Sequence, residues 1–492
     1  MDPLALLEEA ARRRPRGVAA RCGPLAIGYA DLRAHVSRIG RLMAEAGARP
    51  GDRVAALFPN CHLFLACYFG ALERGFVLVP LNLRLSLLEI DAILKHSGAR
   101  VLIGERALVG GVTEGETGVA GLAAAAPTVT DGVAVAPLRT SDGSADEPSP
   151  DGAAHLYYTS GTTGAAKGVI LTRGNLAAHV EMTLEELGFH ENDVWLHAAP
   201  MFHLADAWAV WSVTAAAGTH VFLPRFEAAA AFDLCAEAGV TVTNLVPTML
   251  RGLLAEAERR DRRLPTLRLL LSGGAPIAPR TVAQVADRLG CEYVQTYGLT
   301  ETSPFLTFSL LDEEMRRLPA EERLRYRART GRPARGIELR VVRPAGVGRL
   351  EEVPADDATV GEVVVRGPTV SPGYWRNEAA TREAFRDGWF HTGDLGTLDR
   401  RGSLNLVDRA KDVVITGGET VYSTEVEHVL YEHPAVREAA VFGVPDESWG
   451  EAVRAAVVPA SPGGVAPGEL IEFCRARIAH YKCPRAIDLL ET

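Results

Sequence analysis

The chain has 492 residues, 47% apolar and 23% charged, a composition typical of soluble globular proteins and a length too great for one compact core. Its net charge of −10 argues against nucleic-acid binding, because no basic stripe is available to meet phosphates. The seven cysteines form no Cys-x-x-Cys pair, and no apolar run approaches the roughly 20 residues that span a bilayer. Because Met1–Ala5 does not resemble the start of a signal peptide, we expect a reduced, cytoplasmic protein without a membrane span.

Apolar runs alternate with helical patterns over about the first four hundred residues. The predicted strands are Arg53–Phe58, Phe76–Pro80, Val101–Ile103, Leu156–Tyr158, Val194–His197, Thr219–Leu223, Val240–Val246, Leu267–Leu271 and Glu292–Gln295. Helices are predicted between them, for instance over Asp31–Ala46 and Ser86–His96. Alternating strands and helices form largely parallel sheets that bind ligands at the carboxyl ends of their strands. The pattern therefore predicts an α/β protein.

Two stretches depart from this alternation. Residues 106–151 are rich in Gly, Ala, Thr, Ser and Asp, which predicts a weakly ordered connection with one short helix at 118–126. From about 331 to 407, strand-like runs at Ile337–Val342 and Glu362–Arg366, with a turn at Asp399–Gly402, predict a β-rich subdomain.

Beyond Asp408 the sequence predicts a small α+β domain, residues 408–492, after a large N-terminal domain, residues 1–407. Thr424 and Glu427 have the spacing of a capping box for a helix through residue 432. Strands are predicted over 436–444 and 452–459, and a helix over 467–480.

The strongest chemical feature follows the predicted strand Leu156–Tyr158. It reads Tyr-Thr-Ser-Gly-Thr-Thr-Gly-Ala-Ala-Lys-Gly from Tyr158 to Gly168. Its glycines let backbone amides turn inward, its hydroxyls add donors, and Lys167, one of only four lysines, supplies a point charge. The combination suits a polyphosphate. It is not a Walker loop, because Gly168 stands where a magnesium-binding Ser or Thr would follow the lysine.

Two further turns follow predicted strands, at the edge where open sheets bind ligands. Ser272–Pro276 reads Ser-Gly-Gly-Ala-Pro, and Tyr297–Pro304 reads Tyr-Gly-Leu-Thr-Glu-Thr-Ser-Pro. In the second turn Tyr297 can stack on a base, Thr300 can donate to a phosphate and Glu301 can ligate magnesium. Each turn taken alone is equally typical of a plain strand-to-helix connector.

Two segments nearer the carboxyl end carry weaker signals. Asp394, in Thr-Gly-Asp, is a carboxylate fixed in a turn, where it can accept both hydroxyls of a ribose. Asp408–Asp412 leads into Thr416–Glu419, and by charge alone this segment is an ordinary solvated turn.

Together these segments resemble, in order and spacing, the adenylate-forming superfamily of acyl-CoA synthetases, luciferases and peptide-synthetase adenylation domains. The hydroxyl-glycine loop, followed by Tyr-Gly-x-Thr-Glu and Thr-Gly-Asp, is highly specific. The resemblance is closest to fatty- or aryl-acyl-CoA ligases. It implies a large N-terminal domain of two doubly wound sheets with the β-rich subdomain, and a small mobile C-terminal domain.

The resemblance also implies a role for each matching residue. Thr300 contacts the α-phosphate, Glu301 binds magnesium, and Asp394 and Arg409 hold the ribose. The residues implied to bind ATP or coenzyme A are Thr159, Ser160, Gly161, Thr162, Thr163, Gly164, Lys167, Gly273, Gly274, Ala275, Tyr297, Gly298, Thr300, Asp394, Arg409, Gly417 and Gly418. The residues implied in catalysis are Thr163, Lys167, His203, Thr300, Glu301 and Lys411.

The implied reaction has two steps and uses ATP, Mg²⁺, coenzyme A and a small carboxylic acid. The carboxylate attacks the α-phosphate, pyrophosphate leaves, and an acyl-adenylate remains. The small domain then turns about Lys411 and brings Gly417 and Gly418 toward the site, where the CoA thiolate attacks the carbonyl. His203, in Pro-Met-Phe-His, matches the gate beside the acyl pocket, and a packed loop histidine is its alternative. A homodimer is left open.

The sequence departs from the family pattern twice. Ala166 replaces a proline before the loop lysine, a change expected to be mild because it removes no donor. Tyr481–Pro484 matches the start of the family's last motif, but the Gly-Lys pair expected roughly ten residues further on is not reached by Thr492. We therefore expect weak adenylation by this chain. Two explanations for the missing lysine are left open: the chain is trimmed, or the protein is a natural pseudoenzyme. A restored Gly-Lys tail should raise pyrophosphate release by orders of magnitude.

The stretch Met201–Phe226 is expected to contribute to the acyl pocket, through residues such as Leu204, Ala205, Ala207, Trp208, Val210 and Trp211. Its apolar character favours a fatty or aromatic acid over an amino acid, whose ammonium group needs a carboxylate. Asp206 could supply that carboxylate, and the tryptophans could simply pack an interior helix. A carrier-protein acceptor in place of CoA, and a nucleotide-binding pseudoenzyme, also remain open.

Overall fold

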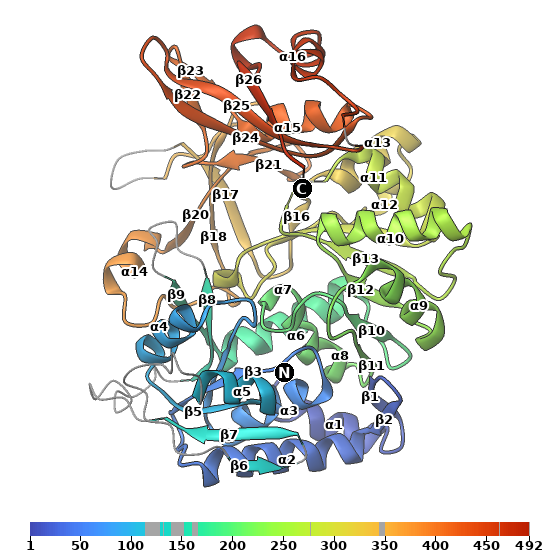
Figure 1. Ribbon diagram of the computed structural model, residues 1–492, viewed down its shortest axis with the longest axis vertical. Helices are drawn as coiled ribbons and strands as arrows, with labels where there is room; N and C mark the ends of the chain where they lie inside the picture. The colour runs from blue at the N-terminus through green and yellow to red at the C-terminus, as the bar shows by residue number, and fades with distance from the viewer. Residues whose placement is uncertain are drawn as a thin grey trace.

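The computed structural model describes residues 1–113, 128–130, 132–138, 152–159, 166–275, 277–343, 350–461 and 463–491. A large α/β body forms the lower part of the molecule, and a smaller C-terminal unit lies above it (Figure 1). The expected α/β fold with a large and a small part is confirmed. The division at residue 408 stays a prediction, because the strand Leu404–Arg409 runs through it.

The large body contains two sheets with parallel centres. In the first, β12 pairs in parallel with both β10 and β13, and β13 pairs in parallel with β14. Its strand order is β16 (Arg332–Pro333), β15 (Thr307–Phe308), β14 (Glu292–Tyr297), β13 (Leu269–Ser272), β12 (Val242–Asn244), β10 (Val194–His197), β11 (Thr219–Phe222), β1 (Val18–Cys22) and β2 (Leu25–Gly28).

In the second sheet β3 pairs in parallel with β4 and β5, while the last pair, β8 and β9, is antiparallel. Its order is β6 (Thr128–Thr130), β7 (Val133–Pro137), β5 (Ala99–Glu105), β3 (Arg53–Leu57), β4 (Val77–Pro80), β8 (Ala153–Thr159) and β9 (Lys167–Thr172).

Helices cover these sheets, and most of them bury apolar residues in the core. They are α1 (Leu6–Arg13), α2 (Tyr29–Glu45), α3 (His62–Glu73), α4 (Leu87–Ser97), α5 (Arg106–Thr113), α6 (Arg173–Leu187), α7 (Leu204–Ala207), α8 (Ala209–Ala215), α9 (Ala228–Ala238), α10 (Pro247–Arg260), α11 (Pro279–Gln284), α12 (Glu313–Arg316) and α13 (Ala320–Ala328). Trp195, Trp208 and Trp211 are completely buried between them. Among the described helices, none has the length and apolarity needed to cross a membrane.

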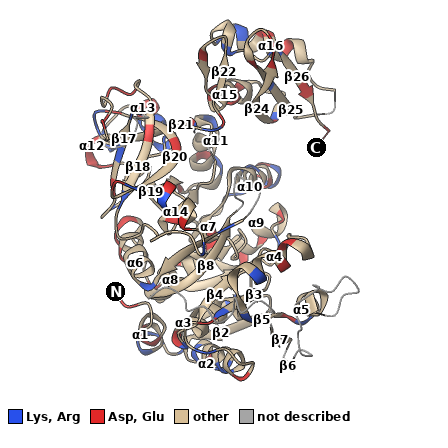
Figure 2. Ribbon diagram, turned by 90° about the vertical axis from the view of Figure 1, so that its left-hand side faces the viewer, with Lys and Arg blue, Asp and Glu red and all other residues tan. Residues whose placement is uncertain are grey.

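The β-rich subdomain and the C-terminal unit each contain a five-stranded sheet. The first consists of β17 (Glu338–Val342), β18 (Gly361–Arg366), β19 (Phe385–Arg386), β20 (Trp389–Leu398) and β21 (Leu404–Arg409), with α14 (Glu378–Ala384) beside it. The second consists of β22 (Val414–Thr416), β23 (Glu419–Val421), β24 (Val436–Asp446), β25 (Gly450–Pro459) and β26 (Ala486–Leu489), with α15 (Ser423–Glu432) and α16 (Pro467–Arg475). Figure 2 shows acidic and basic residues intermixed over both parts.

Three sequence predictions need correction. Residues 106–151 include α5 and the paired strands β6 and β7, while the predicted helix at 118–126 lies outside the described residues. Thr424 does not cap a helix, because α15 already begins at Ser423 and the Thr424 hydroxyl donates to the carbonyl of Val407. The helix predicted over 467–480 ends at Arg475 and is followed by a separate 3₁₀ turn at His480–Lys482.

Candidate active site

Three adjoining cavities lie where strands of the two large sheets end. The central cavity, of about 460 Å³, shares Gly274, Thr296, Gly298, Leu299 and Arg409 with an upper cavity of about 360 Å³. It is lined by Thr159, Lys167, Ala199, Leu204, Ala205, Asn244, Val246, Gly273, Gly274, Thr296, Gly298, Leu299, Thr300, Glu301, Pro304, Phe305, Tyr374, Thr392 and Arg409. The fold therefore brings Lys167, Gly273, Gly274, Thr300, Glu301 and Arg409 together, as the sequence predicts.

One end of the central cavity carries charge. Lys167 begins β9, and its Nζ lies 5.2 Å from the centre of the Tyr374 ring. The Tyr374 hydroxyl donates to Oε1 of Glu301 at 2.8 Å. Desolvation raises the pKa of the Glu301 carboxyl, and the bond from Tyr374 opposes that rise. The aromatic residue thus links the cation and the carboxylate.

Backbone contacts fix this arrangement. The Ser371 amide donates to the carbonyl of Glu301 at 2.7 Å, and the Ser371 hydroxyl donates to the carbonyl of Ile170 in β9 at 2.7 Å. The Trp375 amide donates to the carbonyl of Gly168 at 2.7 Å. Residues 371–375 therefore tie the strand that carries Lys167 to the turn that carries Glu301.

The upper cavity contains a buried polar network. The Tyr297 hydroxyl donates to Oδ2 of Asp394 at 2.7 Å, and Nε of Arg409 lies 3.3 Å from Oδ1. Burial raises the pKa of Asp394, and its bond with Tyr297 opposes that effect. Ala275 and Gly298 also line this cavity, next to Glu427 and His428 from α15. A polar group that sits here faces a carboxylate, a guanidinium and an aromatic ring.

The central cavity also has apolar walls. Its lining includes Ala199, Leu204, Ala205, Val246, Leu299 and Phe305. Glu301 is the one carboxylate among the described residues that line the cavity, and it lies at the charged end. The apolar lining suits an uncharged carbon skeleton.

The two alternatives that the sequence left open for Met201–Phe226 are resolved by packing. Trp208 and Trp211 are fully buried in the core and do not line the cavities described here. Asp206 is also fully buried, with Oδ2 2.5 Å from Nδ1 of His197. The carboxylate that could have bound a substrate ammonium group therefore faces a histidine instead.

A third, side cavity of about 660 Å³ meets the central one at Thr159, Leu204 and Thr300. His203 lines it together with Phe202, whose ring centre lies 4.6 Å from that of the histidine. Desolvation, with a smaller contribution from Arg84, lowers the pKa of His203, so the ring is neutral near pH 7. His203 thus lines the side cavity, directly before Leu204, which belongs to both cavities.

Several predicted residues either fall outside the described part of the chain or line none of the three cavities. Ser160, Gly161, Thr162, Thr163 and Gly164 are outside the described residues. Lys411 lies exposed in the turn between β21 and β22, where the Asp412 amide donates to the carbonyl of Arg409 at 3.0 Å. Gly417 and Gly418 form the β22–β23 turn and line none of the three cavities in this orientation of the C-terminal unit.

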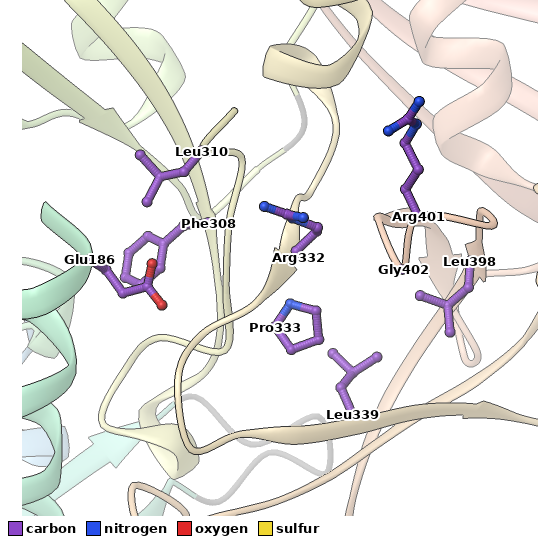
Figure 3. A pocket seen from close by; sticks show the side chains of 9 residues that line it. All are labelled: Glu186, Phe308, Leu310, Arg332, Pro333, Leu339, Leu398, Arg401 and Gly402. Carbon is purple, nitrogen blue, oxygen red and sulfur yellow. The ribbon is translucent and has the colours of Figure 1, made fainter. Parts of the chain in front are cut away.

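A further cavity, of about 370 Å³, lies apart from these three (Figure 3). Phe308, Leu310, Pro333, Leu339 and Leu398 form its apolar wall, with Glu186, Arg332, Arg401 and Gly402 around them. Arg332 is paired with Asp312 at 2.8 Å and Arg401 with Glu314 at 3.0 Å. Both cations already have acidic partners, so this cavity adds nothing to the site.

Sequence reasoning missed several lining residues, among them Asn244, Phe305 and Tyr374. Asn244 is the one amide side chain in the predicted strand Val240–Val246, which was a usable signal. Phe305 directly follows the Tyr297–Pro304 turn. Tyr374 lies 73 residues after Glu301, and no local pattern connects the two.

Lys167 and Glu301 in the central cavity, the Tyr297–Asp394–Arg409 network beside them and the apolar lining residues define a nucleotide-binding α/β enzyme that also holds a carbon skeleton. The chain belongs to the AMP-binding enzyme family: the model of that family matches residues 7–375, and the model of the AMP-binding enzyme C-terminal domain matches residues 425–492.

Similarity to individual proteins extends over nearly the whole chain. A feruloyl-CoA synthase of Amycolatopsis sp is 38% identical over 487 residues, which cover 98% of this chain and 93% of the relative. A long-chain-fatty-acid–CoA ligase of Mycobacterium tuberculosis is 34% identical, covering 94% and 89%. The structure of o-succinylbenzoate CoA synthetase from Bacillus subtilis with its acyl-adenylate intermediate has a TM-score of 0.82 and 30% identity, covering 99% and 94%.

Proposed function

We propose that the protein is an AMP-forming acyl-CoA ligase that activates an apolar, fatty or aromatic carboxylic acid as its adenylate and transfers the acyl group to coenzyme A. The observation that carries this proposal is the junction of two cavities at Thr159, Leu204 and Thr300. An acyl-adenylate in the central cavity has its carbonyl near this junction. The side cavity gives a second substrate a separate approach to that carbonyl.

In the first step a carboxylate oxygen attacks the α-phosphorus of ATP. The bond to the bridging oxygen breaks, and pyrophosphate leaves with the electron pair. Lys167 and Arg409 offset the negative charge, and the Thr300 hydroxyl is placed to donate to the α-phosphate. Asp394 accepts the ribose hydroxyls, with its orientation held by Tyr297.

The residues at the charged end also fit a magnesium ion. Carboxylate oxygen is a donor that Mg²⁺ prefers, and Glu301 presents one beside the position proposed for the phosphates. When bound with ATP, the ion supplies charge neutralisation of the phosphates. Tyr374 orients the carboxylate that would hold it.

In the second step the CoA thiolate attacks the acyl carbonyl, and AMP leaves. Lys411 lies in an exposed turn between the two parts of the chain, a suitable place for a hinge. Rotation there would carry the Gly417–Gly418 turn from its present position toward the junction, as the family resemblance implies. Because a hinge at Lys411 would separate two moving parts, we propose that the boundary between the N-terminal and C-terminal domains lies at residue 408.

Support for the acid class comes from the apolar lining residues of the central cavity and from the relatives. Two relatives are named for feruloyl and long-chain fatty acyl groups, and neither acyl group contains an ammonium group. We place the enzyme in the cytoplasm, where its seven free thiols would stay reduced. A carrier protein as acceptor remains the second candidate, because the side cavity is compatible with any thiol-bearing arm.

The test supplies a set of fatty and aromatic acyl-adenylates with CoA and looks for thioesters by mass spectrometry. This assay bypasses adenylation, so it does not depend on the Gly-Lys pair. Thioester formation well above the uncatalysed rate is expected. Bound adenylate with no thioester would contradict CoA as the acceptor and favour a carrier protein or a pseudoenzyme.

Replacing Tyr374 with phenylalanine should weaken magnesium binding while metal-free ATP binding stays unchanged. The change removes the hydroxyl that orients Glu301 but keeps the ring beside Lys167. Loss of a partner that orients a metal ligand lowers metal affinity by about tenfold. The measurement is the Kd of ATP by calorimetry, in EDTA and over a series of Mg²⁺ concentrations.

A second variant separates the ring from the hydroxyl. Tyr374→Leu removes both, so the Kd of ATP in EDTA should rise as well, because Lys167 loses its aromatic neighbour. Tyr29→Phe is the matched control, since it removes a buried hydroxyl that donates to the carbonyl of Gly218 at 2.6 Å in the N-terminal core. Equal magnesium dependence in Tyr374→Phe and the control would refute the orienting role.

A further inference from the structure

Asn244 is a buried polar side chain with one half of its amide unused. It ends β12, is only 6% exposed and lines the central cavity. Its Nδ2 donates to the carbonyl of Ala205 at 2.6 Å, while its Oδ1 has no hydrogen-bond partner among the described residues. Asn244 thus lines the cavity and has a buried carbonyl oxygen that no described residue satisfies.

The orientation of this amide is locked. The Ala205 carbonyl also accepts from Nε1 of Trp208 at 3.1 Å. An amide flip would place Oδ1 of Asn244 next to the Ala205 carbonyl oxygen, and two acceptors would then face each other. Oδ1 is thus held away from Ala205, in a side chain that lines the cavity.

The residues around Asn244 indicate which substrate can donate a hydrogen bond to its Oδ1. An acceptor buried without a partner costs about 1–3 kcal/mol, so a ligand that donates a hydrogen bond to this oxygen would recover that free energy. Asn244 lines the central cavity and not the upper cavity, which contains Tyr297 and Asp394. The upper cavity therefore holds the nucleoside. The carboxylic acid in the central cavity is then the substrate that can donate a hydrogen bond to Asn244.

The walls near Asn244 favour an aromatic skeleton. Ala199, Ala205 and Gly273 are small, and the ring of Phe305 packs edge-on against Trp208 with centres 4.9 Å apart. Small residues and one ring held by its neighbour leave room for a planar group in this cavity. A planar ring that carries a hydroxyl would fill this space and supply the missing donor.

We infer that Asn244 is a specificity-determining residue that selects hydroxyl-bearing aromatic carboxylic acids, its Oδ1 accepting the hydrogen bond from the substrate hydroxyl. The inference rests on the proposed function, since it assigns the substrate class of the same site. An acid without the hydroxyl leaves Oδ1 unsatisfied, so discrimination comes mainly from rejection of the deoxy analogue.

The test uses a pair of stable adenylate mimics, cinnamoyl- and 4-hydroxycinnamoyl-sulfamoyladenosine, with the 3-hydroxy isomer as a third probe. Binding is measured by calorimetry, which requires no turnover. Of the two hydroxylated mimics, the tighter binder should bind the wild-type protein about 30-fold more tightly than the deoxy mimic. In Asn244→Leu, which has similar volume, the ratio should fall below about threefold.

Two further variants isolate the effect. Asn244→Ala should also lose the preference, and Asn192→Leu, the same change on an exposed turn, should keep it. The ratio is insensitive to general damage, because damage weakens both mimics alike. The inference about Asn244 would be overturned if the wild-type protein bound the two mimics within threefold of each other, or if Asn244→Leu kept the preference for the hydroxylated mimic. Neither result would contradict the proposed function. Failure of all the mimics to bind the wild-type protein would instead contradict the proposed adenylate chemistry.

Discussion

Replacing Glu301 with glutamine is expected to slow acyl-adenylate formation by roughly a thousandfold, because the charge at the phosphate end can no longer be balanced by a metal ion. Glutamine keeps the shape of the side chain and still accepts from the Tyr374 hydroxyl. It lacks the negative charge that a magnesium ligand needs here, since no other carboxylate lines the described part of the central cavity.

The measurement is the rate of hydroxamate formation when the adenylate is trapped with hydroxylamine, in the 492-residue chain and in a form extended by a Gly-Lys tail. The second half-reaction gives the internal control. Thioester formation from supplied acyl-adenylate involves no pyrophosphate, so Glu301→Gln should leave it nearly unchanged. Equal losses in both half-reactions would show that the substitution damages the site as a whole.

Local patterns predicted the elements that position the site. The strand Val194–His197 was predicted to the residue, because four consecutive residues of a buried parallel strand leave little ambiguity. The predicted helix Ser86–His96 agrees to within one residue, since Ser86 and Glu89 form a reciprocal capping box and Gly98 ends the helix in the left-handed region. Such signals lie within one turn of the element that they define.

The same capping pattern failed at Thr424 and Glu427, and the reason is tertiary. Thr424 donates to Val407, and Glu427 accepts from the amide of Val441 at 2.9 Å. Both side chains are used by strands that the pattern does not include. A capping box is therefore a sound prediction only where no neighbouring strand competes for the same donors and acceptors.

The finer chemistry of the site also comes from distant contacts. The strand containing Asn244 was predicted, but the direction of its amide is set by the Ala205 carbonyl in α7. The link between Lys167 and Glu301 depends on Tyr374, which follows β18 of a different subdomain. The family motifs locate binding residues along the chain, while their neighbours decide what those residues can discriminate.

Replacing Gly298 with alanine should destabilise the protein by about 3 kcal/mol and abolish tight nucleotide binding. A Cβ at this position would lie 1.8 Å from the carbonyl oxygen of Pro304 and 3.0 Å from the amide nitrogen of Leu306. These atoms are backbone, so no side-chain rotation relieves the clash. The Leu306 amide also donates to the carbonyl of Tyr297 at 2.7 Å, which holds the two segments together.

Relief of the clash requires the turn Thr300–Thr302 to move, because it connects the two segments that collide. That movement displaces Glu301 from Tyr374 and disturbs Tyr297 beside Asp394, so both ends of the nucleotide site change together. The melting temperature and the Kd of AMP report the two effects. Gly111→Ala, in α5 with nothing within 4 Å of its added Cβ, should leave both unchanged or raise stability slightly. Normal AMP binding by Gly298→Ala would mean that the turn can shift without moving the groups that hold the nucleotide.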